Sequence, residues 1–96
     1  MKNNLLDSYS NEVKKISDLG YSDIMLKEIE PNLNTDFHSH DFGAYACVVK
    51  GQFIVNDTKK DHVMNPGDFL AVDMNQQHSE KTFANGATLL LGKKYK

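Results

Sequence analysis

The chain has 96 residues, one cysteine and no arginine, and its formal net charge is −2. This length allows one domain, and 40% hydrophobic with 25% charged residues is typical of a globular rather than a disordered protein. A single cysteine excludes an internal disulfide, and the scattered lysines form no basic stripe for nucleic acid. No apolar run approaches the ~20 residues of a membrane span, and the start lacks the apolar segment of a signal peptide. We therefore expect a cytoplasmic protein that binds neither nucleic acid nor a membrane.

The first segment has the apolar spacing of an amphipathic helix. Its apolar residues recur at steps of three and four from Leu5 to Leu19. Asn4 is a suitable N-cap residue, and Gly20 stands where helices commonly end in a left-handed residue. We predict an N-terminal helical arm over residues 1–21. Its apolar stripe is expected to cover a face of its own domain, although the same stripe could bind a partner.

From Tyr21 onward, short β-rich segments alternate with turn residues. The predicted strands are 24–29, 44–50, 52–55, 62–64, 69–72, 82–83 and 87–91. Several short strands separated by turns at intervals of about 8–12 residues are typical of an all-β sandwich or barrel. The sequence therefore predicts an all-β fold with one N-terminal α-helix, in which a barrel of seven or eight strands occupies residues 22–96.

Three of the four histidines form a candidate metal site. His38 and His40 are two residues apart, so in a strand both imidazoles would point to the same face. Neutral imidazole is the commonest metal ligand, and two on one face can bind one ion. His78 follows about forty residues later, after enough chain for the hairpins that would bring it beside the pair. His62 lies near a turn and is expected at the surface.

The histidines and the turns between them resemble the two motifs of the cupin superfamily. His38-Ser39-His40, position 44 and Gly51 have the spacing of the first motif, and Pro66-Gly67-Asp68 with His78 has that of the second. The motif resemblance covers residues 35–80, and the flanking segments look like those of small bacterial cupins with an N-terminal helix. It implies a cupin-type double-stranded β-helix, or jelly-roll barrel.

The same resemblance implies a divalent metal ion, which could be iron, manganese, nickel or zinc. His38, His40 and His78 occupy the positions of the family's three histidine ligands. The family's fourth ligand is usually a glutamate, but position 44 is alanine here. We therefore expect three histidines plus water at the metal. Asp36 and Asp41 lie beside the histidine pair, but strand parity turns Asp41, like Tyr45, away from the site.

Three functions fit this constellation. In the first, the metal centre acts on a small molecule by dioxygenase, isomerase or lyase chemistry, because such a metal can act as a Lewis acid or bind dioxygen. In the second, the barrel binds or senses a small ligand, with or without metal. In the third, the histidines are vestigial and the barrel is structural. No motif identifies a general base, so no catalytic residue is assigned. Candidates for an apolar pocket wall, equally well explained as core, are Phe42, Ala46, Val48, Phe53 and Phe69.

Two further expectations concern the cysteine and the assembly. Cys47 lies in a β-rich run, where an inert buried thiol is expected rather than a nucleophile. A small barrel has strand edges that proteins commonly protect by pairing or covering them. We therefore expect a homodimer with twofold symmetry.

Overall fold

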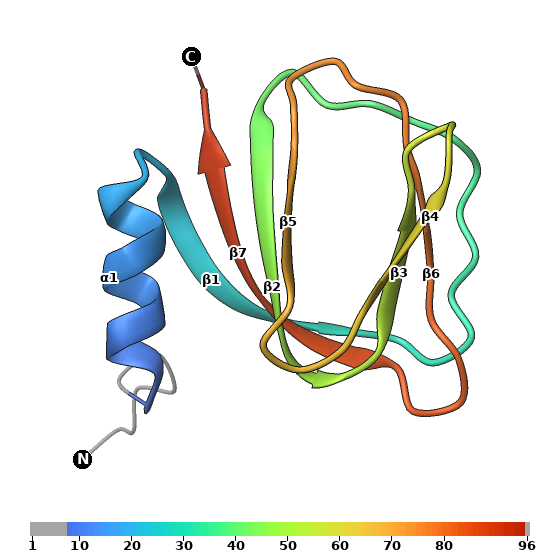
Figure 1. The fold of residues 1–96 in the computed structure, drawn as a ribbon, viewed down its shortest axis with the longest axis horizontal. Helices are drawn as coiled ribbons and strands as arrows, with labels where there is room; N and C mark the ends of the chain where they lie inside the picture. Colours follow the sequence, from blue (N-terminus) through green and yellow to red (C-terminus); the bar gives the residue numbers. More distant parts are fainter. Residues whose placement is uncertain (1–7, 96) are drawn as a thin grey trace.

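A computed structural model describes residues 8–95, which fold into two antiparallel sheets and one helix (Figure 1). The elements are α1 (Ser10–Asp18), β1 (Ser22–Ile29), β2 (Gly43–Gly51), β3 (Phe53–Asn56), β4 (Asp61–Met64), β5 (Phe69–Val72), β6 (Ser79–Lys81) and β7 (Ala87–Lys94). One sheet has the strand order β1-β7-β2-β5 and the other β4-β3-β6. The predicted all-β fold with an N-terminal helix is confirmed. Over residues 8–95 the structure has no helix with the length and apolarity that a membrane crossing requires.

Helix α1 ends where the sequence predicts. Gly20 has a φ of +98°, and its N–H donates to the Ser17 carbonyl at 2.9 Å. The Tyr21 N–H donates to the Ile16 carbonyl at 3.4 Å, which completes the pair of hydrogen bonds known as a Schellman motif. The predicted start at Asn4 lies outside the described residues.

The apolar face of α1 packs on the outer side of the four-stranded sheet. Ile16 is buried against Tyr45 and Leu90. Gly92 permits this close approach, because a Cβ there would lie 2.8 Å from Ile16 Cγ2. Cys47 is half-buried beside the same cluster, and burial raises the pKa of its thiol, as expected for an inert cysteine. The apolar stripe of the helix therefore covers a face of its own domain, as expected, rather than lying free to bind a partner.

A second apolar cluster lies between the two sheets. It consists of Ala46, Val48, Phe53, Val55, Met64, Ala87 and Leu89. Several of these side chains also line an internal cavity, so the core and the cavity are continuous. Val48 belongs to the core alone, with 1% of its surface exposed. Phe69 contradicts its prediction as wall or core, since it is 55% exposed and stacks on Tyr45 on the outer face.

One predicted strand is wrong. The segment at 82–83 is not a strand; instead β6 covers Ser79–Lys81 and pairs with β3. Thr82 lies just beyond β6, where its hydroxyl donates to the Glu30 carbonyl at 2.6 Å and accepts from the Leu33 N–H at 3.0 Å. A β-branched and an aromatic residue favour a strand at 82–83, whereas the observed strand β6 consists of polar residues.

Candidate metal site

A cavity of about 360 Å³ lies between the two sheets. Its wall is mainly apolar and includes Phe42, Ala46 and Phe53, as the sequence predicted. Polar side chains enter it from two sides. Lys27 and Lys93 come from the four-stranded sheet, and a cluster of histidines with one glutamate comes from the other side.

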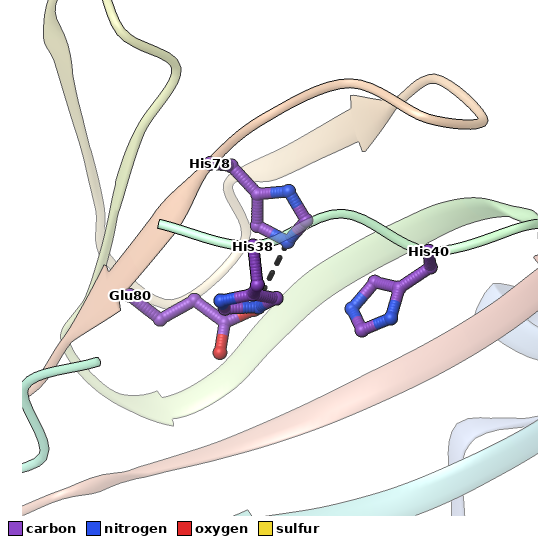
Figure 2. A group of neighbouring side chains, drawn as sticks. All are labelled: His38, His40, His78 and Glu80. Carbon is purple, nitrogen blue, oxygen red and sulfur yellow. Dashed lines mark ion pairs between the residues drawn. The ribbon is translucent and has the colours of Figure 1, made fainter. Parts of the chain in front are cut away.

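Four side chains that could hold a metal ion converge in this cavity: His38, His40, His78 and Glu80 (Figure 2). One ligand atom from each lies within 4.8 Å of those of the others. The ring centroids of the three imidazoles are 4.5, 5.2 and 5.3 Å apart. The fold therefore brings together the three histidines that the sequence identified.

Backbone pairing positions the two most closely spaced imidazoles. His38 and His78 form an isolated antiparallel bridge, in which the N–H of each donates to the carbonyl of the other at 2.9 Å. His38 and His40 share the cavity although the segment around them is not a regular strand. Glu80 follows His78 by two residues, so the extended chain presents both side chains on the same face.

Hydrogen bonds to backbone carbonyls orient two of the imidazoles. His38 Nδ1 donates to the Asp36 carbonyl at 2.8 Å, and His78 Nδ1 donates to the Gln76 carbonyl at 2.9 Å. Because a carbonyl oxygen only accepts, Nδ1 carries the proton in both rings, and a neutral ring then has a lone pair on Nε2. These Nε2 atoms lie 3.7 and 3.5 Å from Glu80 Oε2. Metal-binding histidines are commonly fixed in this way.

The donor set fits a divalent cation. Two imidazole nitrogens and a carboxylate oxygen face one another. Neutral imidazoles in this arrangement would offer their lone pairs, with that of the carboxylate, to one cation. Imidazole nitrogen combined with carboxylate oxygen suits zinc, iron, nickel and manganese.

His40 joins the group with its ring stacked on Phe42. The two ring centroids lie 4.8 Å apart at an interplanar angle of 14°. Burial, followed by the neighbouring His78 and His38, lowers the pKa of His40. A lowered pKa favours the neutral imidazole, which is the form that binds metal.

Solved structures with a similar fold identify the fold family of this chain. No protein-family model matches the sequence, and no curated protein matches it. An RmlC-like cupin from Shewanella frigidimarina superposes with a TM-score of 0.60 and 22% identity, over 73% of this chain and 65% of that chain. This chain has the cupin fold.

Two further solved structures resemble this cupin barrel. A predicted oxalate decarboxylase from Thermotoga maritima matches with a TM-score of 0.64 and 18% identity, over 84% of this chain and 72% of that chain. A protein of unknown function from Rhizobium leguminosarum matches with a TM-score of 0.69 and 13% identity, over 74% of this chain and 67% of that chain. Similarity at these identities establishes the fold alone.

The carboxylate of the cupin site comes from a residue that the sequence analysis missed. Ala44 lines the cavity, as strand parity predicts, but the carboxylate beside the histidines belongs to Glu80. Glu80 is thus a candidate fourth ligand beside the three expected histidines. The signal was the spacing of His78 and Glu80, whose side chains share a face in an extended chain.

The remaining acidic and histidine candidates lie outside the cluster. Asp36 and Asp41 are not members of the group, and Asp36 contributes only its carbonyl oxygen. His62 lies in the β3–β4 hairpin, with its Nε2 atom 2.7 Å from Asp57 Oδ2. The hydrogen bond from His62, followed by those from the Lys59 and Lys60 amides, holds the pKa of Asp57 far below its ordinary range. His62 is therefore separate from the site, but its side chain is partly buried rather than fully at the surface as expected.

Proposed function

We propose that this cupin binds one divalent metal ion through His38, His40, His78 and Glu80 and uses it to bind and transform a small molecule. The observation that supports this most is the convergence of the four ligand atoms within 4.8 Å inside a mainly apolar cavity. Three neutral imidazoles and one carboxylate would leave a divalent ion with a net charge of about +1. An ion of octahedral preference would keep about two positions for a ligand.

Residues of this chain would orient the metal ligands, offset the charge of the ion and limit the access of water. The carbonyls of Asp36 and Gln76 keep the Nε2 atoms of His38 and His78 directed at the ion, and Glu80 offsets part of its charge. The apolar wall limits water, which strengthens electrostatic interactions in the cavity. The metal would supply a Lewis acid that polarises a ligand oxygen, a property used in dioxygenase, isomerase and lyase reactions.

One observation favours a second function, in which the barrel binds or senses a ligand without transforming it. The titratable side chains that line the cavity are the four candidate ligands, Lys27 and Lys93. Once the four ligands hold a metal, no other carboxylate or imidazole from the described part of the chain, residues 8–95, lines the cavity to act as a general base. A binding or sensing protein needs no such group.

The metal content of protein purified without a histidine tag tests the proposed site. We expect one metal ion per chain in the wild type and a large loss of metal in the His38→Ala variant, measured by elemental analysis. His62→Ala is the matched control, because it removes the histidine that lies outside the cluster, and it should retain the wild-type content. Equal metal content in His38→Ala and wild type would contradict the site.

A turnover screen separates the two functions. Iron-, manganese-, nickel- and zinc-loaded proteins are each incubated with a panel of small molecules, and substrate consumption is measured. An enzyme should consume a substrate only in a metal-loaded form that retains His38. Ligand binding without consumption in any loaded form would favour the sensing function.

A further inference from the structure

The four-stranded sheet contributes two lysines to the cavity that faces the candidate metal site. Lys27 comes from β1 and Lys93 from β7, whereas Glu80 belongs to the three-stranded sheet. Lys93 Nζ lies 4.8 Å from the centroid of the Phe42 ring, and the same ring stacks on His40 at 4.8 Å. Lys93 and His40 therefore contact the same aromatic ring, which places the Lys93 ammonium close to the histidine cluster.

Neither lysine has an acidic partner in the part of the chain that the structure describes. Within residues 8–95, no carboxylate lies within ion-pair distance of Lys27 or Lys93. Among residues 8–95, Glu80 is the sole acidic residue that lines the cavity, so the two lysines leave this lining with a formal charge of +1. A divalent ion bound at the site would raise this charge to +3, although the chain as a whole has a net charge of −2. Charges beside an apolar wall are only weakly screened, so the cavity should attract an anion.

The alanine at position 44 offers no carboxylate to the neighbouring Lys93 ammonium. Ala44 and Lys93 are direct partners in the register of β2 and β7. Side chains of such partners share a face of the sheet, and both residues line the cavity. A carboxylate at position 44 would lie beside the Lys93 ammonium and neutralise it, whereas the methyl group of alanine leaves that charge available to a ligand.

We infer that the ligand of this cavity is a small organic carboxylate held between the metal centre and Lys93. The inference rests on the proposed metal site, and Lys27 adds attraction from its more exposed position on β1. A carboxylate fits better than a phosphate, because the chain has no arginine for a bidentate contact and α1 packs outside the barrel. The apolar wall suits an apolar body, and the volume corresponds to about a dozen water molecules.

Chemical-shift titrations of the zinc-loaded protein with butanoate and butanamide test this inference. The two probes have the same size and differ in charge. We expect butanoate to bind about tenfold more tightly than butanamide, and Lys93→Met to weaken butanoate binding about tenfold, the range of one charge-assisted hydrogen bond. Lys94→Met is the matched control. It removes the same charge from the next residue of β7, whose ammonium lies over Tyr21 on the helix side of the sheet.

The zinc content of every sample is measured alongside the titration, so that two failures can be told apart. Wild-type protein that takes up no zinc would overturn both the metal site and this inference. Zinc-loaded protein that binds no butanoate, binds butanamide or inorganic phosphate as tightly, or is insensitive to Lys93→Met would overturn only the carboxylate inference. Loss of butanoate binding in Lys93→Met with full zinc content, and its retention in Lys94→Met, would support it.

Discussion

The Glu80→Gln variant is expected to bind zinc at least about a hundredfold more weakly than the wild type. Glutamine keeps the size of the side chain but removes the negative charge that offsets the ion. Groups that merely orient metal ligands already change metal affinity by about 10–100-fold, so loss of a charged ligand should cost at least as much. The measurement is a competitive titration of each protein against a chelating dye.

A second variant separates the effect of losing the Glu80 ligand on zinc affinity from the effect of a changed net charge. Glu28 is an exposed residue of β1 that does not line the cavity, so Glu28→Gln makes the same chemical change elsewhere on the barrel. Its zinc affinity should equal that of the wild type. If Glu80→Gln behaved like Glu28→Gln, the ion would be bound by the three histidines and water, as the sequence alone suggested.

The Thr82→Val variant is expected to lose about 1–3 kcal/mol of unfolding free energy. Thr82 is 2% exposed, and its hydroxyl bonds both the Glu30 carbonyl and the Leu33 N–H. Valine has nearly the same shape but can form neither bond, so it leaves a backbone acceptor and a backbone donor without their protein partner. Urea denaturation followed by circular dichroism measures the loss.

The same variant should also weaken metal binding although Thr82 contributes no ligand. The irregular segment that leads to His38 is joined to residues 78–82 by hydrogen bonds of Leu33 with Thr82 and of Thr35 with Glu80. Isolated bridges at Asn34–Lys81 and His38–His78 complete this pairing. Thr88→Val is the control, because no hydrogen bond of the Thr88 side chain is found within residues 8–95; it should change stability by less than about 0.5 kcal/mol. Equal stability of the two variants would show that Thr82 does not anchor this segment.

The elements that the sequence predicts correctly are those whose pattern is local. The strand at 69–72 coincides with β5, and the glycine at position 20 marks the end of α1 because only the local backbone conformation is involved. Strand β6 could not be predicted in the same way. It is short and polar, and it is a strand because it pairs with β3, which lies more than twenty residues earlier in the chain.

Three members of the candidate site could be predicted from histidine spacing, but its carboxylate could not. The cupin pattern places a glutamate at position 44 on β2, whereas this barrel presents Glu80 from β6 to the same cavity. Strands of both sheets line the same cavity, so a carboxylate can reach the site from either sheet. The position of Lys93 next to Ala44 likewise depends on the register of β7 against β2, which the sequence does not reveal.

A crystal structure of the zinc-loaded protein, with the ion located by anomalous scattering, tests the proposed metal site most directly. We predict one zinc ion about 2.0–2.2 Å from the Nε2 atoms of His38 and His78, a ring nitrogen of His40 and a carboxylate oxygen of Glu80. A zinc ion bound outside this cluster, or one bound by the histidines with Glu80 turned away, would contradict a centre of three histidines and one glutamate.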